Sequence, residues 1–294
     1  MSFIPVLYAL VVEKVMIRHI TKLPPVIWYG VEVQMDIRDV IHRKISGGHF
    51  EKTERRFIAK ILGDGRVAID IGAHCGFMTV AIAKSMGVNG VVHSYEPIPQ
   101  NAAELTRNVR TLGERVLVHQ VAVVATSETS LLLGRPDLWK IEESLTSGNY
   151  SSCIRENAIE VKAININSVL DQHKTIDLVK IDIEGLETEI IQNITIQNLA
   201  KLSNIMFETV LGRGVPSNKL KDAIFELEQN GFYVFRPLPL VSSKSTVMGL
   251  SFSTVSWMVR LIAPVMRLFI GIDMTTVNFV AVQSSNSSYK LRLI

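Results

Sequence analysis

The stretch VAIDIGAHCGFMTVAIAKS, residues 67–85, constrains the fold of this chain more than any other. Its first five residues are a short apolar run of the kind that forms a buried parallel strand. Gly72 and Gly76 follow in a predicted tight turn, and a helical pattern begins near Phe77. Because glycine has no side chain, such a strand–turn–helix unit brings backbone N–H groups close to a ligand. The stretch therefore predicts an α/β fold with a nucleoside-binding turn.

The residues around this turn favour one cofactor over another. Glu96 ends a second apolar run, where a carboxylate can accept hydrogen bonds from both ribose hydroxyls of a nucleoside. A dinucleotide fingerprint needs G-x-G-x-x-G, but His74 and Phe77 stand at the second and third glycine positions. Asp70, just before the turn, would repel a pyrophosphate and suits a ligand that carries an ammonium and a sulfonium. The pattern favours S-adenosylmethionine over NAD, and a turn whose glycines serve only packing is the alternative.

Composition excludes several classes of protein. The 294 residues are 47% hydrophobic and 20% charged, which is typical of a globular chain with a full core. The net charge of +3 is too small to indicate a nucleic-acid partner. Cys75 and Cys153 do not make a disulfide framework, and the seven histidines lack the spacing of metal ligands. We expect a reduced, cytoplasmic protein without a metal ion.

Two apolar segments qualify this expectation. Residues 1–20 have helical spacing but are too short to span a bilayer. Residues 247–272 are strongly apolar, yet Arg260 and Arg267 would each cost about 2.5–3.5 kcal/mol at mid-bilayer. The two arginines share one helix face, as in an interfacial helix. Both segments either make peripheral contact with a membrane or pack on their own domain or a partner subunit, and the oligomeric state stays open.

The remaining pattern alternates strands and helices, as a parallel sheet requires. We expect strands near 67–71, 91–95, 117–123, 177–182, 204–208, 232–236 and 277–282. We expect helices near 51–62, 77–86, 99–112, 186–193 and 217–230, and a small extra hairpin within 130–170. Residues 1–49 are predicted to form an N-terminal helical extension, whose first helix, over residues 1–20, is ended by Pro24 and Pro25. Residues 50–294 then form the main domain, with an apolar helical insertion at about 240–272.

Four acids stand at the carboxyl ends of predicted strands, which meet at one edge of a parallel sheet. They are Asp70, Glu96, Asp182 and Glu208. Any one of them could be a helix cap or a solvated turn residue, but together they indicate a ligand crevice. Acids grouped in this way are expected to raise one another's pKa, which suits a general base.

Three motifs in order resemble the FkbM family of S-adenosylmethionine-dependent methyltransferases. They are DIGAHCGFMTVAIA, SYEPIPQNAAELTRNV and IDLVKIDIEGLETEIIQN, and the similarity spans about residues 50–236. His74 departs from the family pattern, which usually has asparagine there. The resemblance implies an α/β fold: a seven-stranded, mostly parallel, Rossmann-like class I methyltransferase sheet. Helices would cover both faces, and the last strand would be antiparallel.

The resemblance also implies roles for individual residues. The cofactor would contact Asp70, Gly72, Ala73, His74, Gly76, Glu96, Pro97, Val121, Ala122 and Asp182. Within this set Glu96 would take the ribose hydroxyls, and Val121 and Ala122 would face the adenine ring. Asp182 is the first candidate for a catalytic base, followed by Glu184 and Glu208. Binding of the methionine ammonium is the alternative role for Asp182.

The family implies O-methylation of a hydroxyl on a sugar, glycan, lipid-linked or other small-molecule acceptor. Two alternatives stay open. The chain could bind S-adenosylmethionine without catalysis, or it could methylate nitrogen in RNA or protein. Against the second, the turn after Ile181 reads DIEG and offers no aromatic side chain to stack on a base.

Overall fold

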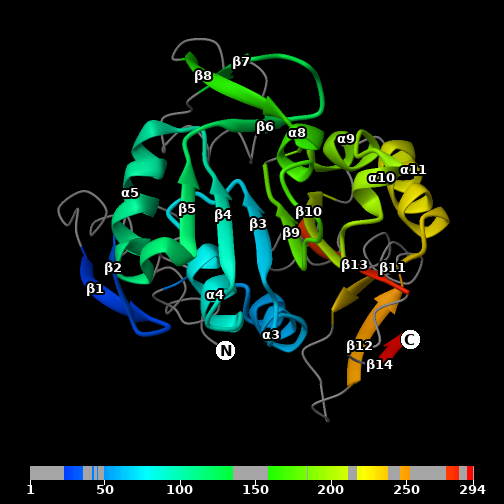
Figure 1. Cartoon of the computed structure of the whole chain (residues 1–294), viewed down its shortest axis with the longest axis horizontal. Coiled ribbons are helices and arrows are strands. Elements are labelled where there is room, and N and C mark those ends of the chain that lie inside the picture. Colours follow the sequence, from blue (N-terminus) through cyan, green and yellow to red (C-terminus); the bar gives the residue numbers. More distant parts are fainter. Residues whose placement is uncertain are drawn as a thin grey trace, which may run out of the picture. The chain divides into compact units, whose positions relative to one another are not determined.

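A computed structural model of the chain describes residues 23–35, 42, 45, 50–134, 158–183, 185–210, 217–237, 246–251, 276–284 and 290–293 (Figure 1). The chain divides into two compact units. The first comprises residues 1–52 and 132–159, and the second comprises residues 53–131 and 160–294. The grouping of residues 132–159 with the N-terminal residues was not expected from the sequence.

The first unit contains an antiparallel hairpin of β1 (Leu23–Trp28) and β2 (Val31–Met35). Its turn uses Tyr29 and Gly30, both at positive φ, which matches the twist of the two strands. Pro24 and Pro25 lie inside β1, an edge strand that tolerates proline. The helix expected over residues 1–20 lies outside the described residues.

The second unit is built on a nine-stranded sheet of order β14-β12-β11-β13-β10-β9-β3-β4-β5 (Figure 1). The neighbouring strands β10, β9, β3, β4 and β5 are mutually parallel, whereas β13 is antiparallel to both β10 and β11. This confirms a mostly parallel core from β5 to β11 with one antiparallel strand. The bounds are β3 (Val67–Ile71), β4 (Val91–Tyr95), β5 (Val116–His119), β9 (Leu178–Ile181), β10 (Asn204–Val210), β11 (Phe232–Pro237), β12 (Thr246–Ser251), β13 (Thr276–Gln283) and β14 (Lys290–Leu293).

Helices cover both faces because alternate strand residues are buried on opposite sides. Ile69, Ile71 and Phe207 share one apolar cluster with residues of α8, α9, α10 and α11. On the other face, Phe57 of α3 packs against Phe235. The helices are α3 (Lys52–Ile61), α4 (Phe77–Ser85), α5 (Pro99–Val109), α8 (Ile166–Leu170), α9 (Glu187–Gln192), α10 (Ile196–Leu199) and α11 (Ser217–Gln229). A short 3₁₀ turn, η1 (Arg110–Arg115), follows α5.

Two predicted elements differ in the structure. The strand expected at 117–123 is divided, because the chain bends where the Val121 N–H donates to the His119 carbonyl at 3.0 Å. The strand β5 ends there, and β6 (Ala122–Val124) joins a separate sheet of order β6-β8-β7, with β7 at Ser130–Gly134 and β8 at Ala158–Asn165. These last two strands agree with the extra strands expected within 130–170.

The apolar insertion begins as a strand rather than as a helix. Residues 246–251 form β12, which pairs with β11 on one side and β14 on the other. The open edge of β11 offers backbone hydrogen bonds to this segment, and these override its helical pattern. The rest of the insertion, residues 252–275, lies outside the described residues. None of the helices that the structure describes combines the length and the apolar character needed to cross a bilayer.

Candidate functional site

The turn between β3 and α4 approaches the end of β9 very closely. Gly72 has φ +78°, and a Cβ built on it would lie 1.8 Å from the carbonyl oxygen of Asp182. The N–H groups of Gly72 and Ala73 both donate to the Tyr95 carbonyl, at 2.9 and 3.0 Å. These bonds hold the turn against the end of β4. Any side chain at Gly72 would therefore push β9 away, which is why the sequence needs glycine here.

His74 continues the turn in a left-handed conformation with φ +49°. Histidine and asparagine are both enriched in this region, so the replacement of the family's usual asparagine keeps the backbone shape. The His74 N–H donates to Glu96 Oε2 at 2.9 Å, and its ring Nδ1 lies 3.1 Å from Cys75 Sγ. Gly76, at φ +92°, closes the turn, and a Cβ there would lie 2.5 Å from Leu105 Cδ1. The turn is thus shaped by contacts with α5 as well as with β9.

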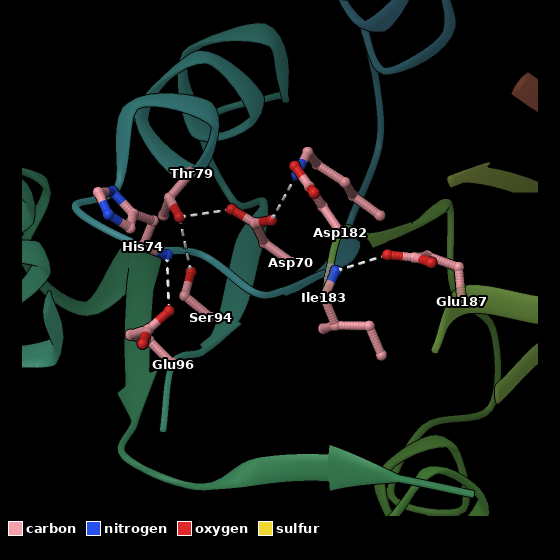
Figure 2. Close-up of polar contacts among 9 residues, drawn as sticks. Asp70, His74, Thr79, Ser94, Glu96, Asp182, Ile183 and Glu187 are labelled. Atoms are coloured by element: carbon pink, nitrogen blue, oxygen red, sulfur yellow. Dashed lines mark hydrogen bonds and ion pairs between the residues drawn. The ribbon is translucent and has the colours of Figure 1, made fainter. Parts of the chain in front are cut away.

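Glu96 joins the turn to the start of α5 and is only 4% exposed. Its Oε2 accepts the His74 N–H (Figure 2). Its Oε1 accepts the Ile98 N–H at 2.9 Å and a hydrogen bond from Asn101 Nδ2 at 3.3 Å. Burial raises the pKa of Glu96, while the N–H donors of Ile98 and His74 oppose the rise. A carboxylate has about four acceptor sites. Glu96 can therefore take about one further donor, fewer than the two ribose hydroxyls expected from the sequence.

Asp70 lies deeper than the sequence suggested. Its side chain is fully buried, and Thr79 Oγ1 donates to Oδ2 at 2.6 Å while also lying 3.1 Å from Ser94 Oγ (Figure 2). Asp70 Oδ1 lies 3.9 Å from Lys180 Nζ and has no hydrogen-bond partner within the described part of the chain. Burial raises the pKa of Asp70, against the opposing effects of Lys180 and Thr79. Asp70 therefore faces the protein interior.

Asp182 follows β9 and keeps contact with solvent, with a side chain 22% exposed. Lys180 Nζ donates to Asp182 Oδ2 at 2.9 Å. Burial alone would raise the pKa of Asp182, but the Lys180 ammonium and hydrogen bonds from Lys180 and Glu208 hold it below its usual value. The expectation that the grouped acids raise one another's pKa is therefore wrong for Asp182. It is an ionised carboxylate at the edge of the sheet.

Glu187, in the first turn of α9, is a residue that sequence reasoning missed. It is buried, and its Oε1 accepts the Ile183 N–H at 3.0 Å (Figure 2). The same oxygen accepts the Gly185 N–H, also at 3.0 Å. Burial raises the pKa of Glu187, and these N–H donors oppose the rise. An acid in the first helical turn after a glycine could have revealed this cap in the sequence. Glu184, a candidate base, lies outside the described residues.

The other predicted contacts are only partly brought together. The Glu96 N–H donates to the His119 carbonyl at 3.1 Å, so the ends of β4 and β5 are joined. Pro97 and Val121 are half-buried beside these ends, whereas Ala122 is buried in β6 of the separate sheet. Glu208, on β10, lies next to β9 and opposite Asn278 of β13. No group of three or more potential ligands in the described ranges is arranged to hold a metal ion.

The arrangement suits a nucleoside that carries a positive charge. The glycine turn between β3 and α4 has Glu96 on the β4 side and Asp182 on the β9 side. Glu96 can accept a hydroxyl donor, and ionised Asp182 can bind an ammonium. Two phosphates would meet carboxylates on both sides of the turn, which disfavours a dinucleotide.

Comparisons with known proteins place this geometry in a family. Residues 70–210 match the family model described as the methyltransferase FkbM domain. No curated protein matches the sequence.

Among solved structures, the chain is similar to precorrin-6y C5,15-methyltransferase from Geobacter metallireducens, at 16% identity and TM-score 0.40, covering 78% of this chain and 88% of that one. It is similar to an S-adenosylmethionine-dependent O-methyltransferase from Thermotoga maritima, at 16% identity and TM-score 0.38, and the match covers 79% of this chain and 65% of that one. It is also similar to magnesium protoporphyrin IX methyltransferase from Synechocystis, at 10% identity and TM-score 0.43, covering 84% and 85%. Likenesses of this strength carry no argument about activity, so the family model alone supports the assignment.

Proposed function

Because residues 70–210 of this chain are a methyltransferase domain of the FkbM family, we propose that the protein methylates a hydroxyl group on a sugar, glycan, lipid-linked or other small-molecule acceptor. Bound S-adenosylmethionine supplies the activated methyl group on a sulfonium. The proposal is carried by one observation: ionised Asp182 and Glu96, which can accept about one further donor, lie on either side of a turn that requires glycine at residue 72. These groups match the ammonium and the ribose of the cofactor.

The lowered pKa of Asp182 favours one of its two candidate roles. A carboxylate that Lys180 holds ionised is a weak base, because basicity falls with the pKa of the conjugate acid. It is a good partner for the methionine ammonium, since two unit charges in contact near a protein surface interact by about 4 kcal/mol. We therefore assign Asp182 to cofactor binding and not to proton removal.

Glu208 is the base that this assignment leaves. It lies on β10 and is half-buried at the same edge of the sheet. Its hydrogen bond to ionised Asp182 requires the protonated form of Glu208, so Glu208 acts as a base only after it has lost that proton. An alcohol is a weak nucleophile, so a positioned base that accepts its proton contributes about 10²–10⁴-fold to the rate. Alignment of the hydroxyl with the methyl group supplies the rest of the catalysis.

Calorimetry of the purified chain with S-adenosylmethionine and with NAD, side by side, tests the cofactor. We expect binding in the micromolar range for the first ligand only, which corresponds to about 8 kcal/mol. Asp182→Asn should weaken this binding by at least about tenfold, because the ammonium loses its counter-charge. The exposed α11 residue Glu228 provides a matched control, and Glu228→Gln should bind as the wild type does. Binding of NAD, or of neither ligand, would contradict the proposal.

The reaction is tested with cofactor labelled on the methyl group and a panel of acceptors bearing hydroxyls, amines or RNA bases. We expect label on hydroxyl acceptors. Glu208→Gln should keep cofactor affinity within about threefold and lower the rate of transfer by about 10²–10⁴. Label on RNA or on protein amines would show that the acceptor class is wrong, and absence of transfer with intact binding would favour a non-catalytic role.

A further inference from the structure

We propose that Lys180 is a positioning residue, whose buried ammonium orients Asp182 and keeps it charged for binding of the cofactor's ammonium. This inference rests on the proposed function. Lys180 itself does not reach the ligand, since its side chain is only 5% exposed. It acts through the carboxylate of Asp182, to which its Nζ donates at 2.9 Å.

The register of the sheet places these charges in one row. Asp70 on β3 is the Cα partner of Lys180 on β9, so both side chains leave the sheet on the same face. Asp182 lies two residues after Lys180 and returns to that face. The row therefore runs from the fully buried Asp70, through Lys180, to the partly exposed Asp182.

The two distances indicate which acid the lysine serves. Lys180 Nζ lies 3.9 Å from Asp70 Oδ1 but 2.9 Å from Asp182 Oδ2. A lysine kept only to neutralise a buried charge would bind the buried acid more closely, because desolvation penalises an unpaired charge most where water is excluded. Here Lys180 donates its hydrogen bond to Asp182 at the edge of the sheet, and the buried Asp70 accepts a hydrogen bond from Thr79 instead.

The negative charge of the row lies at its exposed end, because burial raises the pKa of Asp70 whereas Lys180 keeps Asp182 ionised. A ligand ammonium that reaches this end meets an ionised carboxylate. Lys180 thus allows the edge to hold an acidic group that is ionised near neutral pH in spite of its burial. Without Lys180, burial would dominate and the pKa of Asp182 would rise.

Other titratable groups also act on this row, and they do not replace Lys180. Those that face it within the described residues are His74 from the β3–α4 turn, Glu187 from α9 and Glu208 from β10. Two of these three are acids. His74 lowers the pKa of Asp182 too, but its effect is smaller than that of Lys180. Replacing Lys180 therefore removes the main cation that keeps Asp182 ionised.

The test measures S-adenosylmethionine affinity by calorimetry between pH 6 and 8 for the wild type, Lys180→Met and Lys180→Arg. The wild-type affinity should vary by less than about threefold across this range. Lys180→Met should bind at least about tenfold more weakly at pH 7, and its affinity should rise with pH as Asp182 loses its proton. Lys180→Arg, which keeps the charge, should restore the flat profile.

A ligand without the amino-acid part separates positioning from folding. 5′-Methylthioadenosine has no ammonium, so all three proteins should bind it equally. The double variant Asp70→Asn/Lys180→Met leaves no unpaired charge in the interior and should show the same selective loss of S-adenosylmethionine affinity. If Lys180→Met and the double variant both bind S-adenosylmethionine and 5′-methylthioadenosine more weakly than the wild type, Lys180 has only a structural role and the inference is wrong.

The two proposals fail in different ways. If the wild type binds S-adenosylmethionine and Lys180→Met binds it with the same affinity and pH profile, the inference about Lys180 is wrong and the proposed function stands. If the wild type itself does not bind S-adenosylmethionine, the proposed function is wrong and the inference falls with it.

Discussion

Two strand–turn–helix units of this sheet look alike in sequence, but they need the glycine in their turns for different reasons. The unit β3–α4 turns through Gly72 at φ +78°, and the unit β9–α9 turns through Gly185 at φ +114°. A Cβ at Gly72 would overlap the Asp182 carbonyl, whereas no atom of the described residues lies within 4 Å of a Cβ at Gly185. The first glycine is required by packing and by backbone conformation, and the second only by conformation.

The acids near the two strand ends differ in the same way. Burial raises the pKa of Asp70, whereas the pKa of Asp182 is lowered, because Lys180 and Glu208 outweigh its burial. The same lysine serves both groups, but it donates to the one at the edge. The same residue type is therefore buried against Thr79 at the end of β3 and, in the function that we propose, binds the cofactor after β9.

The largest expected difference between the two units is in the free energy of unfolding when Gly72 or Gly185 is replaced by alanine. Gly72→Ala should lower the free energy of unfolding by at least about 3 kcal/mol, because the new Cβ must displace the end of β9. Gly185→Ala should cost only about 1–2 kcal/mol, from its positive φ alone. Urea denaturation of both variants measures the difference. Equal costs would show that the close contact at Gly72 can relax.

The two helices also differ in how their carboxyl ends are capped. Arg115 reaches α4 from the far end of η1 and donates through Nη2 to the carbonyls of Ala83, Met86 and Gly87. In α9, Asn193 caps its own helix by donating Nδ2 to the Glu189 carbonyl at 2.9 Å.

Arg115→Met should therefore lower the free energy of unfolding by about 2 kcal/mol, since it strands several carbonyls and removes a cation from a helix terminus. Asn193→Ala should lower it by about 0.5–1 kcal/mol. Thermal or urea unfolding gives both values. A smaller loss for the arginine variant would mean that water caps α4 equally well.

The carboxylates that brace the two turns should differ in their effect on the ligand. Glu96→Gln places an amide N–H₂ against a backbone N–H of the β3–α4 turn and should weaken S-adenosylmethionine binding by about tenfold. Glu187→Gln disturbs the β9–α9 turn in a similar way and should weaken binding by less than about threefold. Calorimetry with the cofactor compares them, and equal losses would place the second turn in direct contact with the ligand.

The smallest effect concerns the opposite face of β4. There His93 stacks on His119 and lies edge-on to His173, at ring-centre distances of 5.5 and 4.7 Å. Burial, followed by repulsion from the other two rings, lowers the pKa of His93 to about 4. The unfolded chain, with a histidine pKa near 6.5, therefore binds more protons than the folded protein below that pH.

Stability should accordingly fall as the pH drops from 6.5 to 5, and His93→Phe should reduce the fall. The measurement is the urea midpoint at pH 7 and at pH 5.5. In this window the acids whose pKa is raised in the folded protein can take up protons there but not in the unfolded chain, so they oppose the fall, and the contribution of His93 is given by the difference between the wild type and His93→Phe. Parallel falls in the wild type and in His93→Phe would exclude this contribution.

Local patterns were enough to predict most strands and helices. The apolar run before Gly72 is a strand, and the alternation around Ile181 brings Lys180 and Asp182 to one face of the sheet. Periodicity and glycine placement act over a few residues, so they can be read directly from the chain. The bend at Val121 was missed, because strand-forming residues continue from 116 to 118 and from 121 to 124, and only the hydrogen bond from the Val121 N–H to the His119 carbonyl marks the break.

What the sequence determined by itself is the order of strands, turns and helices, the glycine turn and the acids at the strand ends, because these depend on neighbours along the chain. The tertiary structure alone decided how those acids behave. It buried Asp70 against Thr79, directed Lys180 to Asp182 and made Glu187 a cap for its turn. The charge of a carboxyl group depends on the water it loses and on the cations that come near it, and both are set by residues far away in the sequence.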